Sequence, residues 1–189
     1  IDAGLDMIEH VSFVEPPGRY RYDDELTRRI RDRGIVVSPT ASAALRIARR
    51  IRESGVTYNS KDFVAIERME GRLTNTVNFH RLDMKIIGGT DCGVTVAPFN
   101  SLVDELLAYT QAGLSTEEAL QTATNKSAEF MNLSRIGEIR AGYHADFTLL
   151  NGNPFEDLNI LRKPSHVFKS GQLVYEKPTG SSNLPASEH

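Results

Sequence analysis

Three short apolar runs, separated along the chain by stretches with helical periodicity, constrain the fold more than any other feature. The runs cover residues 5–8, 35–37 and 84–87. The middle run, Ile35 to Val37, is continuous and β-branched, which is typical of a strand buried on both faces. Because strand and helix alternate, we expect parallel strands joined by crossover helices. The sequence therefore predicts an α/β fold.

Helices are indicated by capping residues, glycine stops and the spacing of apolar residues. The longest periodic segment runs from Ser60 to Asp83 despite a glycine in its middle. A capping box, Ser115 to Glu118, opens another helix. The remaining helices are predicted from an N-cap at Asp23 to a stop at Gly34, over residues 41–54, and from a cap at Ser101 to a stop at Gly113.

The pattern changes near residue 136, where the chain becomes strand-like. The run 136–154 is broken by glycines, and residues 166–176 predict a hairpin about Ser170 and Gly171. We expect three parts: a barrel portion at 1–135, β-sandwich strands at 136–176 and a disordered tail at 177–189, which is rich in Pro and Ser. Residues 11–22 are expected to lack regular structure because they contain Pro16, Pro17 and Gly18.

Composition excludes several classes of partner. The 189 residues carry 22 Lys and Arg against 25 Asp and Glu, so the basic excess that nucleic-acid binding needs is missing. No apolar run approaches the ~20 residues that cross a bilayer, so we expect no membrane partner. The single cysteine, Cys92, cannot form an internal disulfide, which fits a cytoplasmic protein. The chain opens at Ile1 without a methionine or a leader, which we interpret as a cut within a longer protein.

Polar residues follow the predicted strands where ligands bind in parallel α/β folds. His10 follows the first strand and Asp91 the third, while Ser38 and Thr40 end the strand between them. An imidazole and a carboxylate are usual ligands of zinc, so His10 and Asp91 are candidate metal ligands. Ser38, Thr40 and Cys92 are candidate substrate contacts.

Simpler interpretations stay open for these residues. A histidine after a strand is often a hydrogen-bonded structural residue, and an aspartate in a Gly-Thr-Asp turn is often a turn former. A cysteine beside it is more often packed than reactive. Two ligands are also too few for a catalytic zinc, which normally takes three. The other histidines are interpreted as structural or solvent-facing: His80, His144, His166 and His189.

The motifs together resemble the C-terminal half of the metal-dependent amidohydrolase superfamily, with dipeptidases and imidazolonepropionase-like enzymes as the most similar branch. The resemblance rests on AGLDMIEH, VVSPT, KIIGGTDCG, EALQTATNKSAEFM and IGEIRAGYHADFTLLNGNP, in that order. It implies the C-terminal part, strands six to eight, of a (β/α)₈ barrel, followed by part of a small β-sandwich. By position, His10 matches the sixth-strand histidine and Asp91 the eighth-strand aspartate.

The resemblance also implies an activity. One or two divalent ions, most often zinc, would activate a water that attacks the carbon of an amide, a cyclic amide or a short peptide. Asp91 would act as general base and then general acid. His10 would bind the second ion in a binuclear site, or would hydrogen-bond the hydroxide or the substrate in a mononuclear one.

This chain departs from the family pattern, because the first-strand His-x-His pair, the bridging lysine and the fifth-strand histidine should all lie upstream of Ile1. A second hypothesis is therefore that residues 1–189 alone form an inactive, non-catalytic fragment. A third is a phosphate-binding barrel that uses Gly88 and Gly89. The expected partner is a small-molecule or short-peptide substrate, and a homo-oligomer is compatible with the sequence.

Overall fold

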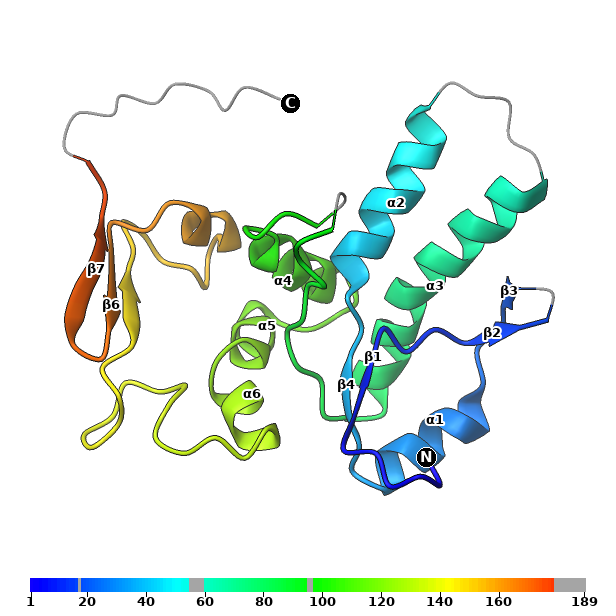
Figure 1. Cartoon of the computed structure of the whole chain (residues 1–189), viewed down its shortest axis with the longest axis horizontal. Helices are drawn as coiled ribbons and strands as arrows, with labels where there is room; N and C mark the ends of the chain where they lie inside the picture. The colour runs from blue at the N-terminus through cyan, green and yellow to red at the C-terminus, as the bar shows by residue number, and fades with distance from the viewer. Residues whose placement is uncertain (17, 55–59, 95–96, 179–189) are drawn as a thin grey trace.

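The protein is mixed α/β with small sheets (Figure 1). The computed structural model describes residues 1–178 except 17, 55–59 and 95–96, and the backbone alone for 60–63. Strand β1 (Met7–Glu9) pairs in parallel with β4 (Val36–Ser38), Met7 lying opposite Val36. The predicted parallel order is thus confirmed for these two strands.

The third predicted strand is reduced to one parallel bridge between Val37 and Ile86. Two backbone bonds make it: Val37 N donates to the Lys85 carbonyl and Ile87 N to the Val37 carbonyl. The ladder ends because the Gly88 N–H donates to the Thr122 carbonyl instead of to a strand. The segment still lies beside β4, on the side opposite β1.

Six α-helices occur in the part of the chain that the structure describes, and the helical predictions are confirmed in position. The Asp23 carboxylate caps the first helix by accepting from Leu26 N, and both bonds of the capping box link Ser115 and Glu118. Ser101 stands at its predicted N-cap, but its hydroxyl donates to the Pro98 carbonyl and does not cap the helix. The helices are α1 (Asp24–Asp32), α2 (Ala41–Glu53), α3 (Ser60–Arg81), α4 (Leu102–Gln111), α5 (Thr116–Thr122) and α6 (Asn125–Phe130).

A short antiparallel pair interrupts the segment predicted to be irregular. Strands β2 (Val14–Glu15) and β3 (Arg19–Tyr20) pair across the proline-containing turn. The expectation that this segment lacks regular structure was wrong. Pro16 and Gly18 lie between the two strands, so the backbones of the flanking residues can still pair. The side chain of Tyr20 then packs on α3, where Gly71 leaves room for its ring.

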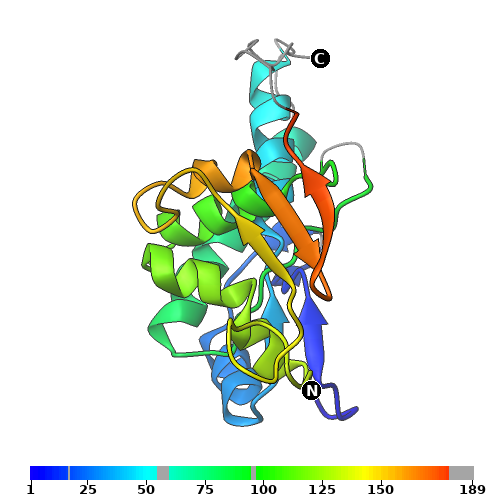
Figure 2. The same ribbon diagram turned by 90° about the vertical axis from the view of Figure 1, so that its left-hand side faces the viewer.

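The last part of the chain forms a three-stranded antiparallel sheet in the order β5 (Phe147–Leu149), β6 (His166–Lys169) and β7 (Gln172–Glu176) (Figure 2). The β6–β7 hairpin turns at Ser170 and Gly171 as predicted, both with positive φ. The strand expected from residue 136 begins only at Phe147, because Gly137 and Gly142 adopt left-handed conformations. A 3₁₀ helix, η1 (Leu158–Arg162), connects β5 to β6. Residues 179–189 of the predicted tail lie outside the described residues.

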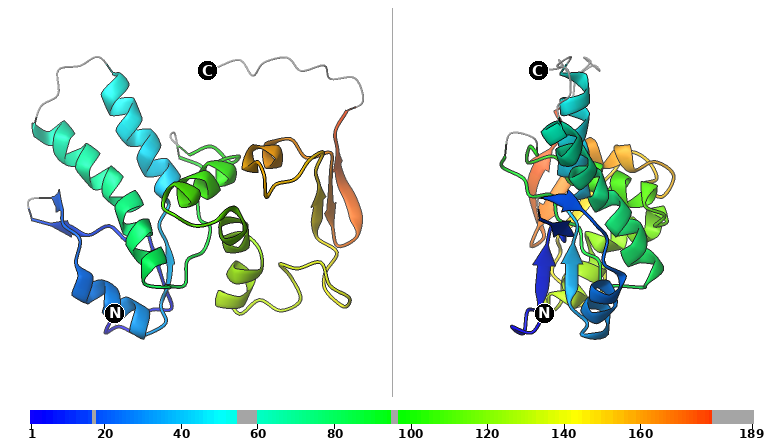
Figure 3. Two further views of the ribbon diagram at one scale, coloured as in Figure 1. Left: turned by 180° about the vertical axis from the view of Figure 1, so that it is seen from behind. Right: turned by 90° about the vertical axis from the view of Figure 1, so that its right-hand side faces the viewer.

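The main core lies between the strands and helices α3 and α4. Val37, Phe79, Leu106 and Tyr109 are almost completely buried in it. A smaller apolar cluster packs α2 against α3, and both helices rise beyond the carboxyl ends of β1 and β4 (Figure 3). Among the described residues, no helix is long and apolar enough to cross a membrane. This arrangement leaves α3 free to place side chains over the ends of the strands.

Candidate functional site

Three of the candidate residues, His10, Thr40 and Asp91, have left-handed backbones at the ends of the strand segments. Their φ angles are 64°, 50° and 52°. This region is uncommon for residues other than glycine and is a clear outlier for β-branched Thr40. Such strained conformations persist only where the surroundings fix them, and they cluster at functional sites. Five other non-glycine residues of the described part of the chain also have positive φ, so the feature is shared by these candidates but is not specific to them: Val11, Asp83, Asn132, Arg135 and Ser170.

The backbone around His10 is held on both sides. Val11 N donates to the Glu9 carbonyl at 2.7 Å, which closes a γ-turn centred on His10. Asn75 of α3 donates from Nδ2 to the Val11 carbonyl at 2.8 Å, and it accepts from the Tyr20 hydroxyl at 2.8 Å. Burial, with a smaller contribution from Tyr22, raises the pKa of Tyr20 to about 12, so its hydroxyl stays a donor. These bonds hold the backbone from which the His10 side chain extends.

The imidazole of His10 is linked through Thr40 to an arginine. His10 Nδ1 lies 2.8 Å from Thr40 Oγ1, and Arg72 Nη1 donates to the same oxygen at 2.7 Å. If Nδ1 carries the proton and donates to Thr40, then Nε2 has a free lone pair that can bind a metal. If Thr40 donates to Nδ1, then Nε2 carries the proton and can donate to a substrate. The two roles left open for His10 therefore correspond to its two tautomers.

Asp91 is exposed and lies near the same arginine. Burial lowers the pKa of Arg72, and the charges of Asp91 and Glu105 oppose this by raising it. Asp91 follows the segment 85–87 and Thr40 follows β4, so both residues stand beyond the carboxyl ends of neighbouring strand segments. Cys92 is exposed beside Asp91 and forms a parallel bridge with Val94.

Ser38 and Thr40 are buried at the end of β4, with 0% and 1% of their surface exposed. The Ser38 hydroxyl packs against Gly89, where an added Cβ would lie 2.1 Å from Oγ. Thr40 supports His10, as described above. Direct contact of Ser38, Thr40 or Cys92 with a substrate stays a prediction.

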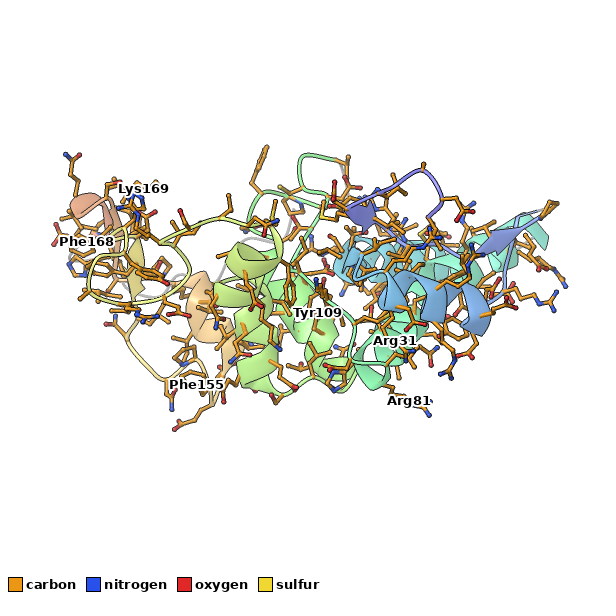
Figure 4. The ribbon with its side chains drawn as sticks, turned by 90° about the horizontal axis from the view of Figure 1, so that it is seen from below. Arg31, Arg81, Tyr109, Phe155, Phe168 and Lys169 are labelled. Atoms are coloured by element: carbon orange, nitrogen blue, oxygen red, sulfur yellow. The ribbon has the colours of Figure 1, made fainter. Side chains whose placement is uncertain are left out.

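A buried carboxylate fixes the start of α2, directly after Thr40. The two carboxylate oxygens of Glu105 accept from Ala41 N and Ser42 N, each at 2.8 Å, and the residue is fully buried. Burial raises the pKa of Glu105, and the hydrogen bonds from Ser42 and Ala41 act in the opposite direction. Tyr109 in turn donates to the Ile87 carbonyl at 2.8 Å. Figure 4 shows Tyr109 inside the molecule, whereas Arg81 lies at its edge.

Sequence reasoning missed Arg72, Asn75 and Glu105. Arg72 and Asn75 stand three residues apart, so they share one face of α3. The sequence contains this spacing, but it also contains many other arginines on predicted helices. Only the packing of α3 over the strand ends distinguishes Arg72 from them.

The structure describes no complete metal centre. Among the described residues, no group of three His, Cys, Asp or Glu side chains is placed to hold a metal ion. Of the two glycines in the phosphate-binding hypothesis, Gly88 already donates its N–H to the Thr122 carbonyl, and the hypothesis stays a prediction. His166 lies 3.6 Å from a Glu176 carboxylate oxygen, far along the chain from the site, and His189 falls outside the described residues.

A hollow of about 540 Å³ lies at the opposite ends of the strands, where Asp6, Gly34 and Lys85 contribute to its lining. Ligands of parallel α/β folds bind at the carboxyl ends of the strands, where His10 and Asp91 stand.

The chain was compared with known protein families, proteins and solved structures. Residues 1–174 match the Amidohydrolase family. The chain is 26% identical over 180 residues to ochratoxinase from Aspergillus niger, which covers 92% of the chain and 34% of that relative. Among solved structures, it is similar to a Xaa-Pro dipeptidase with bound methionine in its active site (TM-score 0.78, 26% identity, 93% of this chain and 41% of that one). It is also similar to a putative prolidase from Bifidobacterium longum (TM-score 0.77, 29% identity, 94% and 44%).

The chain thus spans about a third of ochratoxinase and less than half of the two structures. The family match nevertheless covers most of its length, including both His10 and Asp91. The chain belongs to the amidohydrolase family.

Proposed function

We propose that the whole protein is a metal-dependent hydrolase that cleaves carbon–nitrogen bonds in amides, cyclic amides or short peptides. The observation that carries this proposal is the placement of His10 and Asp91 at the carboxyl ends of neighbouring strand segments, both with strained backbones. Membership of the amidohydrolase family supports it. The similarity to a Xaa-Pro dipeptidase, named for its action on dipeptides, supports the bond type.

In the same proposal, β1, β4 and the segment 85–87 are the sixth to eighth strands of a (β/α)₈ barrel. The sheet β5–β6–β7 is then part of a β-sandwich. The parallel order of the first three segments supports the barrel, and the antiparallel pairing of the last three supports the sandwich.

The donor set fits a divalent metal such as zinc. An imidazole and a carboxylate are the ligand types that zinc prefers, and a ligating histidine usually has its other ring nitrogen held by a hydrogen bond. His10 has this arrangement, with Nδ1 held by Thr40. We propose that the other ligands lie outside residues 1–189, because the described residues hold no third ligand and the relatives are longer.

When bound, the ion would lower the pKa of water and polarise the substrate carbonyl. Asp91 would take one proton from the water whose oxygen attacks the carbonyl carbon. It would then give this proton to the leaving nitrogen as the carbon–nitrogen bond breaks, so that an acid and an amine are released. His10 would bind the metal through Nε2 in one tautomer, or would donate from Nε2 to the substrate in the other.

Removal of the metal from the whole protein tests this proposal. We expect a metal-free preparation, verified by elemental analysis, to lose turnover of a panel of dipeptides, N-acyl amino acids and cyclic amides, and to regain it with zinc or another divalent ion. A His80→Asn variant is a suitable control, because His80 lies on α3 outside the candidate site. Turnover that persists in the verified metal-free protein would contradict the proposed mechanism.

A further inference from the structure

We propose that Arg72 determines substrate specificity by binding a carboxylate of the substrate next to the scissile carbon–nitrogen bond. This inference rests on the proposed function and deepens it. It names the substrate class as N-acyl amino acids and dipeptides with a free carboxylate on the released amine. The assignment comes from the geometry around Arg72.

Arg72 reaches from α3 into the candidate site. Its Nη1 donates to Thr40 Oγ1 at 2.7 Å and its Nε to Ser12 Oγ at 3.3 Å. Since Thr40 also contacts His10, the guanidinium lies two hydrogen bonds away from the imidazole. Over the described part of the chain, both N–H groups of Nη2 remain without a hydrogen-bond partner.

The charge of Arg72 is not matched by a direct ion pair. Its side chain is half-buried, and no carboxylate of the described residues lies within ion-pair distance of it. Glu105 is near, but its oxygens already accept from Ala41 N and Ser42 N. Asp91 is near as well, but the proposed reaction uses it for proton transfer.

A second cation strengthens the attraction for an anion. Arg68 stands one turn before Arg72 on α3. Burial is the main cause that lowers the pKa of Arg72, and the positive charge of Arg68 lowers it further. Burying part of a guanidinium near another cation costs free energy unless an anion binds beside it. A substrate carboxylate would offset this cost.

The shape of the guanidinium selects a carboxylate among anions of small substrates. Its planar fork matches the two oxygens of a carboxylate, whereas a lysine at this place would offer a point charge. In an N-acyl amino acid the α-carboxylate is separated from the scissile nitrogen by a single carbon. An anion held by Arg72 would therefore bring the scissile bond close to His10.

The test compares an N-acyl amino acid with the corresponding N-acyl amino acid amide, which lacks the charge. For each substrate, kcat/KM is measured for the whole wild-type protein and for Arg72→Met, Arg72→Lys and Arg81→Met. We expect Arg72→Met to reduce the acid-to-amide ratio of kcat/KM by about 10- to 100-fold, the range of a charge-assisted hydrogen bond. Arg72→Lys should recover part of the ratio. Arg81→Met, at the exposed end of the same helix, should leave it unchanged (Figure 4).

Other outcomes overturn the inference in distinguishable ways. If Arg72→Met lowers turnover of both substrates equally, Arg72 only positions Thr40 and His10, while the proposed hydrolase function stands. If the wild-type protein hydrolyses neither substrate, calorimetry measures the binding of a product amino acid and of its amide to the wild type and to Arg72→Met. Weaker binding of the acid to Arg72→Met than to wild type would retain the carboxylate site without the proposed function, and equal binding would reject it.

Discussion

At the scale of the residue, one buried hydroxyl links two side chains of the candidate site. Thr40 Oγ1 contacts both His10 Nδ1 and Arg72 Nη1, although its backbone is in a region unfavourable for a β-branched residue. Strain of this kind costs about 1–3 kcal/mol and must be offset by the surrounding structure. Glu105 supplies part of that support by holding Ala41 N and Ser42 N immediately after Thr40.

Replacement of this hydroxyl tests its role. We expect Thr40→Val to lower kcat/KM of the whole protein by about 10- to 100-fold, because it removes hydrogen bonds to an arginine and to the imidazole. Thr40→Ser keeps the hydroxyl and should retain most of the activity. Steady-state kinetics, with thermal unfolding to verify that each variant folds, gives the answer. Full activity in Thr40→Val would show that the link from His10 to Arg72 is dispensable.

The sequence could indicate His10 and Asp91 because both follow apolar runs, and the position after a parallel strand is itself informative. It could not indicate Arg72, whose role depends on how α3 crosses the strand ends. The role of Glu105 could not be predicted either, because it also depends on tertiary packing. Glu105 lies 64 and 63 residues beyond Ala41 and Ser42, the residues whose N–H groups it accepts from, so no local capping pattern contains it.

At the scale of the element, the helices were predicted in position, whereas only some of the strands were: β1, β4 and the β6–β7 hairpin were predicted, and two other segments were not. Caps and glycine stops located α1 and α5 through local bonds at Asp23 and Ser115. The segment 84–87 and the segment after 136 were predicted as longer strands, but strand pairing depends on partners distant in the sequence. At Gly88 the partner is the Thr122 carbonyl, which no pattern of alternation reveals.

The cap of α2 by Glu105 makes a prediction about stability. We expect Glu105→Ala to lower the free energy of unfolding by about 3 kcal/mol, because it leaves the buried Ala41 and Ser42 N–H groups without acceptors. Chemical denaturation measures this change. Glu129→Ala, an exposed position on α6, is the matched control and should change stability little. A Glu105→Ala variant as stable as the wild type would contradict the capping role.

The same residue predicts a pH dependence. Burial raises the pKa of Glu105 in the folded state, so the folded protein binds this proton more tightly than the unfolded chain does. Its contribution to stability is therefore fully present below the ordinary pKa of a glutamate and is lost as the pH rises through the raised value. Denaturation at a series of pH values should show this loss in the wild type and not in Glu105→Gln. If the free energy of unfolding changed with pH equally in the wild type and in Glu105→Gln, the predicted contribution of Glu105 would be refuted.

At the scale of the whole molecule, the described residues end in a sheet that leaves apolar side chains exposed. Leu173, Val174 and Tyr175 of β7 are each more than 40% exposed. Asp104 of α4 pairs with Arg46 of α2 and with Arg162 of η1, the 3₁₀ helix that connects β5 to β6. The chain covers less than half of the structures that it resembles.

This partial coverage predicts a difference in metal content. We expect residues 1–189, purified alone, to bind much less than one zinc per chain, because a site that keeps two of its ligands loses most of its affinity. The whole protein should bind one or two ions per chain. Elemental analysis of both preparations after dialysis measures the difference. Stoichiometric zinc in the isolated residues would reject the hypothesis of a non-catalytic piece.

The central claim is that Asp91 moves the proton in a metal-dependent cleavage of a carbon–nitrogen bond. The most direct test is the turnover number of Asp91→Asn in the whole protein, beside Asp83→Asn as an exposed control that also has a positive φ. We expect Asp91→Asn to fold but to lose almost all turnover, because an amide cannot accept the proton, by about 100-fold or more. Asp83→Asn should keep its turnover. Wild-type turnover in Asp91→Asn would contradict the account.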